Sequence, residues 1–222
     1  MNKYSTVIGM DLGDKHHHFC VLNQASDIEQ EGRLACSEAA LRRTFGCYEG
    51  ALVAIETGTH SRWVSRLLEE LGHTVLVANA RRLRAIYENE RKSDRLDAEM
   101  LARIAKMEPK LLHAITHRGE DAQADLNVIR ARDALVGMRT KLVNHVRGVI
   151  KSHGGRVRRS STPSFHVAAR EALPGSLRAA LLPILESIEE TTERIKAFDQ
   201  DIERLCTEKY PETELLRSVL GV

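Results

Sequence analysis

Hydrophobic and polar residues alternate over short distances in the first third of the chain, which is typical of an α/β domain. Strands are expected at residues 4–11, 18–22, 31–35, 51–55 and 74–78, and helices from residue 37 and over 61–71. The tight segment 11–15 predicts a hairpin connection, so the first strands form an antiparallel meander. The run Ala51–Ile55 is apolar throughout, which indicates a central strand covered on both faces.

The second half of the chain has the periodicity of long helices. Residues 93–106 predict one helix that ends before Pro109, and residues 120–152 predict a much longer one. Glycines and an Arg/Ser/Pro-rich stretch up to residue 163 then break the pattern. Two series with seven-residue spacing follow, which is the pattern of a coiled coil. Their members are Leu181, Ile188, Ile195 and Ile202, and Ile184, Thr191, Phe198 and Leu205. A hairpin of two helices and pairing across a dimer are both consistent with this pattern.

Composition and length indicate a folded cytoplasmic protein. The chain has 222 residues, of which 42% are hydrophobic and 29% charged, so wholesale disorder is excluded. No apolar run approaches the roughly 20 residues needed to cross a bilayer, and the N-terminus lacks the features of a signal peptide. The four cysteines form no CxxC pair, which favours reduced thiols. We expect a first domain over residues 1–117 and a helical region over 118–210.

Charge is segregated along the helical region. Residues 130–159 contain nine Lys or Arg against one acid, whereas residues 183–214 contain four against ten acids. A basic block of this kind suits the phosphates of nucleic acid, although a solvated helix face has the same composition. Aromatic residues are only 4%, so recognition through base stacking is not expected. The candidate nucleic-acid-binding residues are Arg130, Arg139, Lys141, Arg147, Lys151, Arg156, Arg158 and Arg159.

Four acidic residues lie at the ends of expected elements. Asp11 ends the first strand and Glu56 the apolar fourth, so both carboxylates emerge at one edge if these strands are neighbours. Asp94 and Asp97 share one face of a helix because they are three residues apart. Carboxylates gathered in this way repel unless protons, cationic side chains or a multivalent cation accompany them. Hard oxygen ligands favour Mg²⁺ or Mn²⁺.

Structural roles compete with the metal interpretation. Asp94 could cap a helix, Asp97 could interact with the helix dipole, and Asp11 could be a turn residue. Glu56 favours the metal interpretation, because an acid directly after five apolar residues costs free energy unless it is used.

Other polar clusters carry weaker signals. The run His16–His18 cannot bind one ion with all three rings, since neighbours on a strand point to opposite faces. Asp14 and Lys15 are expected in a surface turn, and residues 57–59 are expected to cap the next helix. A second basic run near the acidic residues would suit contacts with a nucleic-acid backbone. It comprises Arg81, Arg82, Arg84, Arg91 and Lys92.

Three segments together resemble a known family. They are Ile8–Gly13 (IGMDLG), Ala54–Gly58 (AIETG) and Lys92–Ala98 (KSDRLDA). In order, spacing and flanking residues they are similar to the DEDD transposases of the insertion-sequence one-ten family, which includes the Piv-type DNA invertases. Their N-terminal domain is similar to the Holliday-junction resolvase RuvC.

This resemblance implies an α/β, RNase H-like fold with a mixed sheet, in which Asp11, Glu56, Asp94 and Asp97 are catalytic and bind divalent metal. It also implies a coiled-coil segment that links protomers and contacts nucleic acid, and a guide RNA from the protein's own element that pairs with DNA. The family's C-terminal domain carries a serine nucleophile and should begin near residue 215, so we expect residues 211–222 to be its start. No nucleophile is assigned within this chain, and the complete reaction is not expected of it.

Two other classes of function remain open from the sequence. An actin-like kinase or ATPase also opens with Asp-Leu-Gly after an apolar strand, but a second glycine-rich phosphate loop is not visible. A non-catalytic coiled-coil regulator could bind nucleic acid through the basic helix alone.

Overall fold

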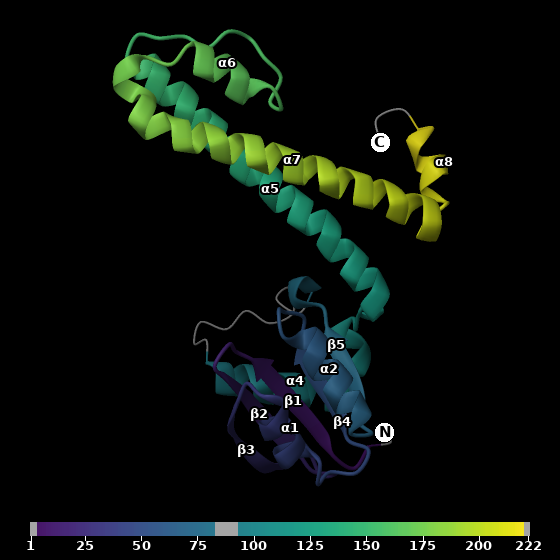
Figure 1. Cartoon of the computed structure of the whole chain (residues 1–222). Coiled ribbons are helices and arrows are strands. Elements are labelled where there is room, and N and C mark those ends of the chain that lie inside the picture. The colour runs from purple at the N-terminus through teal and green to yellow at the C-terminus, as the bar shows by residue number, and fades with distance from the viewer. Residues whose placement is uncertain (1–3, 83–92, 220–222) are drawn as a thin grey trace. The chain divides into compact units, whose positions relative to one another are not determined.

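The computed structural model describes residues 4–82 and 93–219 of the chain. The chain forms two compact units, Met1–His117 and Arg118–Val222. Figure 1 shows the first unit in purple to dark teal and the second in green-teal to yellow. None of the described helices is long and apolar enough to cross a membrane.

The first unit is built on a five-stranded mixed sheet with the strand order β3-β2-β1-β4-β5. β1 pairs antiparallel with β2 and parallel with β4, which confirms the expected meander and mixed sheet. The strands are β1 (Val7–Leu12), β2 (His16–Leu22), β3 (Ile28–Ala35), β4 (Leu52–Glu56) and β5 (Thr74–Ala78). The helices are α1 (Glu38–Phe45), α2 (Ser61–Glu70), α4 (Asp94–Met107) and the short η1 (Pro109–Leu112).

Side chains alternate between two cores on the faces of the sheet. Ile8 and Met10 of β1 pack with Leu41 of α1 and Leu68 of α2 on one face. Val7 packs on the other face with residues of α4, such as Leu101. β4 contributes to both cores, which explains why its sequence is apolar without interruption. The sheet is therefore covered on both sides, as the sequence of β4 predicted.

The second unit is a hairpin of two long helices. α5 (Glu120–Ser152) and α7 (Arg178–Lys209) run side by side in Figure 1, and α8 (Thr213–Arg217) follows. They are antiparallel, since Arg132 of α5 contacts Asp199 of α7 while Arg139 contacts Thr192. All eight residues of the seven-residue series in α7 are buried or half-buried. Within this chain, the hairpin is therefore the arrangement that satisfies the pattern.

A short helix packs near the closed end of the hairpin, which the sequence did not predict. α6 (Phe165–Glu171) buries Phe165 and Ala169 against Val146 and Leu181 of the long helices, and η2 (Gly175–Leu177) leads into α7. Seven residues are two turns of helix, which is too short for a periodic signal. The expected break between the long helices is thus partly helical.

Candidate carboxylate site and basic helical surface

Asp11 and Glu56 lie at the same edge of the sheet. β1 and β4 are parallel neighbours in which Met10 is opposite Ile55, so the two acids occupy the next position of each strand. They point to the face covered by α4, because side chains alternate and Val7 and Ala54 belong to that face. β1 continues to Leu12, so Asp11 is a strand residue and not part of the hairpin connection that we expected.

The start of α4 brings the other two acids to this edge. α4 begins at Asp94, and the backbone N–H of Asp97 donates to the carbonyl of Ser93 at 3.0 Å. Ser93 occupies the N-cap position, so Asp94 is a residue of the first turn and not the cap. The helix lies directly on Gly9, where an added Cβ would be 2.1 Å from the Ala98 carbonyl oxygen. Glycine at this position therefore allows the close approach that places α4 beside β1.

Asp11 is half-buried, and the other three acids lie near enough to affect its pKa. Burial and the nearby charges of Asp94, Asp97 and Glu56 raise the pKa of Asp11 from 3.8 to about 6, while His18 acts in the opposite direction. The neutral form is favoured because a charged carboxyl among other carboxylates is both desolvated and repelled. A cation in this position would restore the charged form of Asp11.

His18 is a member of this cluster that the sequence reasoning missed. Its Nδ1 lies 3.5 Å from Oδ2 of Asp94, and the ligand atoms of Asp11, His18 and Asp94 all lie within 4.8 Å of one another. The signal that could have found it is the β1–β2 register, which places His18 opposite Asp11. Of the adjacent residues His17 and His18, only His18 faces the acids, because His17 points to the opposite face and packs near His60 and Trp63.

Asp14 and Thr57 form local contacts near the site. Oδ1 of Asp14 lies 3.0 Å from Nε2 of His60, within hydrogen-bonding distance, and the rest of the Asp14 side chain is exposed. The Thr57 hydroxyl donates to the Ala78 carbonyl at 2.6 Å. Residues 57–59 do not cap α2 as we expected, since His60 holds the N-cap position without a side-chain cap bond.

The second basic run is described only at Arg81 and Arg82; Arg84, Arg91 and Lys92 lie outside the described residues.

In the second unit, most of the basic candidates are exposed. Arg130 and Lys141 are eleven residues apart, about three turns of α5, and so share a face. This face is opposite to the one that contains Val143 and Val146 and packs on α7. The exposed candidates are Arg130, Lys141, Arg147, Lys151, Arg156, Arg158 and Arg159.

Three of the candidates have contacts within the protein. Arg139 is only 9% exposed, and its guanidinium donates to the Thr192 hydroxyl at 3.3 Å between the two helices. The Arg147 guanidinium lies 4.9 Å from the centre of the Phe165 ring, and Arg158 pairs with Glu171 at 3.0 Å. The helical periodicity could have separated Arg139 from Lys141, because Arg139 is seven residues after Arg132 and faces α7 with it.

The donor set at the sheet edge suits a hard divalent cation. Asp11, Glu56, Asp94 and Asp97 offer carboxylate oxygens from three different elements, and oxygen ligands of this kind match Mg²⁺ and Mn²⁺. The half-buried Asp11 and the solvent-exposed Asp94 leave the edge open on one side. Such an arrangement can hold a cation and still admit a phosphate group.

Comparison with known proteins identifies the family. The family of DEDD transposases of the IS110 type, described as "Transposase", matches residues 8–154. The chain is 29% identical over 149 residues to a transposase for insertion sequence element IS1328 from Yersinia enterocolitica, covering 67% of this chain and 43% of the relative. It is 26% identical over 204 residues to a probable family 20 transposase from Pseudomonas aeruginosa, covering 89% and 58%.

The chain thus spans about half the length of the curated relatives it matches. The match includes Asp11, Glu56, Asp94 and Asp97 together with the whole of α5. The mixed sheet and its helices are those of an RNase H-like fold. The chain belongs to the DEDD transposase family of the IS110 type.

Proposed function

We propose that this chain is the metal-binding and nucleic-acid-binding part of a transposase that recombines DNA. The observation that supports the proposal is that ligand atoms of Asp11, His18 and Asp94 lie within 4.8 Å of one another. Glu56 and Asp97 lie near enough for their charges to raise the pKa of Asp11. Burial, together with the charges of these acids, raises the pKa of Asp11 to about 6. A structural helix start or a surface turn would not require carboxylates from three elements to meet.

Mg²⁺ or Mn²⁺ would be held by these four carboxylates. When bound, the ion supplies positive charge beside a DNA phosphodiester, where it stabilises developing negative charge. Asp11 and Glu56 fix the donors on the rigid centre of the sheet, and Asp94 and Asp97 close the set from the helix. Gly9 contributes by allowing α4 to lie close against β1.

The exposed basic residues of the hairpin would bind nucleic acid. Arg130 and Lys141 share the face of α5 that lies away from α7, and Lys151, Arg156 and Arg159 continue the positive charge toward and beyond the end of that helix. We propose that the ligands are DNA and a guide RNA encoded by the protein's own element. Homo-oligomers formed through the paired helices would bring two such sites to one DNA.

The two other classes of function are outcomes of the same tests. An actin-like ATPase would bind ATP and be stabilised by it, in a manner that depends on Asp11. A non-catalytic coiled-coil regulator would bind nucleic acid through the hairpin without any effect of divalent metal or of Asp11→Asn.

The metal site is tested by thermal unfolding with and without Mg²⁺ or Mn²⁺. Trp63 is the single tryptophan and lies in the sheet unit, so its fluorescence reports the unit that contains the site. Metal at a hundredfold excess over its Kd should stabilise the wild type by about 2.7 kcal/mol. Asp11→Asn should lose this effect, whereas Asp14→Asn should keep it, because Asp14 pairs with His60. Equal stabilisation of all three proteins would contradict the proposed site.

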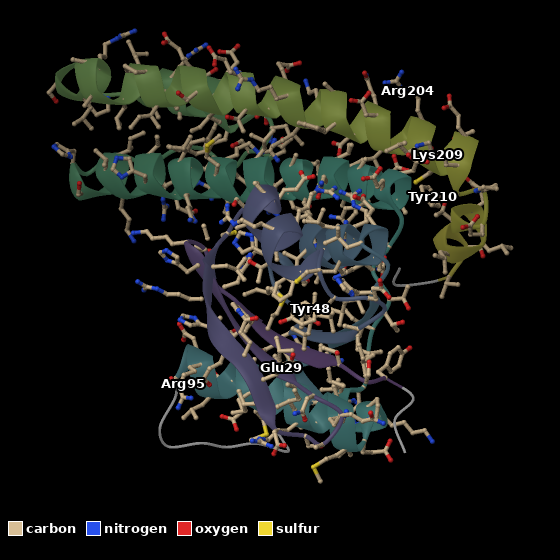
Figure 2. The ribbon with its side chains drawn as sticks, turned by 90° about the horizontal axis from the view of Figure 1, so that it is seen from below. Glu29, Tyr48, Arg95, Arg204, Lys209 and Tyr210 are labelled. Carbon is tan, nitrogen blue, oxygen red and sulfur yellow. The ribbon has the colours of Figure 1, made fainter. Side chains whose placement is uncertain are left out.

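Nucleic-acid binding is tested by titrating a structured RNA and a DNA duplex at several salt concentrations. The double variant Lys141→Gln/Lys151→Gln should bind more weakly, with the slope of log K against log salt lower by about 2. Arg204→Gln is the matched control, because Arg204 is an exposed residue of the acidic helix α7 (Figure 2). An unchanged slope in the double variant would contradict a role of these lysines in phosphate binding.

A further inference from the structure

His18 lies among the carboxylates at the edge of the sheet, although the acidic motif does not include it. Its side chain is 27% exposed, and its Nδ1 lies 3.5 Å from Oδ2 of Asp94. The ligand atoms of His18, Asp11 and Asp94 lie within 4.8 Å of one another, so one cation can reach all three.

The position of His18 follows from the pairing of β1 and β2. Asp11 is directly opposite His18 in the antiparallel register, and the two side chains therefore share a face. Cys20 and Leu22, which follow His18 at intervals of two, pack against Ala98 and Ala102 of α4. His18 is thus fixed on the face where α4 supplies Asp94 and Asp97.

The neighbouring histidines do not share this position. His17 is fully buried on the opposite face beside His60 and Trp63. His16 is exposed at the start of β2. The strand alternation therefore singles out His18 among the three consecutive imidazoles.

A simple ion pair with Asp94 accounts poorly for this arrangement. The Asp94 side chain is 68% exposed, and an exposed pair at 3.5 Å contributes little to stability. The ring also lies within reach of the half-buried Asp11, which a pair with Asp94 alone does not use. A shared cation would use the nitrogen and both carboxylates together.

We propose that His18 is a nitrogen ligand of the carboxylate site and gives it a preference for first-row transition ions over Mg²⁺. This inference rests on the proposed metal site. Imidazole binds ions such as Co²⁺ and Ni²⁺ strongly, whereas Mg²⁺ prefers oxygen ligands and water. A site made only of carboxylates would lack this additional discrimination.

The test compares Co²⁺ and Mg²⁺ binding by the whole chain and its variants. Calorimetry gives both affinities, and the visible spectrum of bound Co²⁺ reports a change from nitrogen to oxygen ligation. His18→Asn should weaken Co²⁺ binding by about tenfold and alter the spectrum, while Mg²⁺ affinity changes by less than about twofold. His16→Asn is the matched control and should leave both affinities and the spectrum unchanged.

Two outcomes separate this inference from the proposed function. If Asp11→Asn loses both metals but His18→Asn binds Co²⁺ like the wild type, His18 is not a ligand and the carboxylate site stands. If Asp11→Asn binds both metals like the wild type, the proposed metal site itself is wrong. Equal losses of Co²⁺ and Mg²⁺ in His18→Asn would overturn the selectivity, and Trp63 fluorescence shows whether that variant remains folded.

Discussion

The sheet unit and the helical hairpin position their charged residues by different means. At the sheet edge, the parallel register of β1 and β4 and the contact of α4 with Gly9 fix where Asp11, Glu56 and Asp94 lie. On α5, arginines differ in burial, since Arg139 is buried against Thr192 while Arg130 is exposed. A strand end in a known register therefore locates a side chain, whereas a count of charges along a helix does not.

The two units also differ in their buried charges. The sheet unit brings like charges together at Asp11 and buries the rings of His17 and His73. The hairpin pairs opposite charges, and hydrogen bonds from Lys209 and Tyr210 hold the pKa of Asp125 below its usual value. Figure 2 labels Lys209 and Tyr210 at the end of α7. Removing the charge of Asp11 should therefore relieve repulsion, whereas removing the charge of Asp125 should weaken its bonds with Lys209 and Tyr210.

The largest expected effect comes from Gly9→Ala in the sheet unit. The new Cβ would lie 2.1 Å from the Ala98 carbonyl oxygen and 2.4 Å from the Ala102 nitrogen, so α4 must move away from β1. We expect a loss of about 3 kcal/mol in the free energy of unfolding, measured by denaturant titration with Trp63 fluorescence. The stabilisation by Mn²⁺ should fall with it.

The same substitution in the hairpin should have the opposite sign. An added Cβ at Gly148, an exposed position within α5, meets nothing within 4 Å. Gly148→Ala should therefore stabilise the hairpin by up to about 1 kcal/mol, measured by circular dichroism. Destabilisation by both substitutions, or by neither, would contradict the contrast between the two units.

A smaller effect is expected from Arg139→Met. The variant removes a buried charge whose Nε has no hydrogen-bond partner, and the Thr192 hydroxyl keeps its bond to the Ile188 carbonyl. We expect the hairpin to become more stable by about 1 kcal/mol, with nucleic-acid affinity unchanged within about twofold. Lys141→Gln should show the reverse pattern, with unchanged stability and weaker binding. A loss of binding in Arg139→Met with no change in stability would place Arg139 at the nucleic acid.

The smallest expected effect is in the pH dependence of the sheet unit. Burial, followed by the nearby charge of His60, lowers the pKa of His17 from 6.5 to about 4, so the unfolded state binds more protons between these values. Stability is therefore lost as the pH falls from about 6.5 to about 4. Burial lowers the pKa of His73 as well, which acts in the same direction.

Asp11 acts in the opposite direction over much of this range. Its pKa in the folded state, about 6 instead of 3.8, means that the folded protein binds more protons between these values. Metal-free wild type should therefore lose less stability on acidification than Asp11→Asn does, measured by Trp63 fluorescence in chelator. Equal slopes for the two proteins would indicate that neither burial nor the neighbouring acids raise the pKa of Asp11.

The sequence predicted most of the fold because its signals were local or strictly periodic. The apolar strand β4 and the seven-residue spacing in α7 each indicate a burial pattern without knowledge of the rest. Gly9 is different, since its role appears only when α4 lies against β1. The helix α6 is too short to produce a periodic signal, and its burial depends on Phe165 reaching the long helices.

The acids of the candidate site were identified from strand ends and helical spacing, but their neighbour His18 was not. Its inclusion depends on the register between β1 and β2, which places it opposite Asp11. The exposure of Arg139 and Lys141 likewise depends on which face of α5 meets α7. Pairing between elements is therefore the information that the linear pattern did not contain.

The most direct test of the central claim is a double-mutant cycle of Asp11→Asn and Asp97→Asn, followed by thermal unfolding of metal-free protein. If the carboxylates form one cluster, each variant should unfold at a higher temperature than the wild type, because each removes repulsion. The double variant should gain less than the sum of the two, since the shared repulsion is removed only once. Mn²⁺ should then stabilise the wild type more than any variant. Two destabilising and additive effects, unchanged by Mn²⁺, would contradict the account and make both residues independent structural elements.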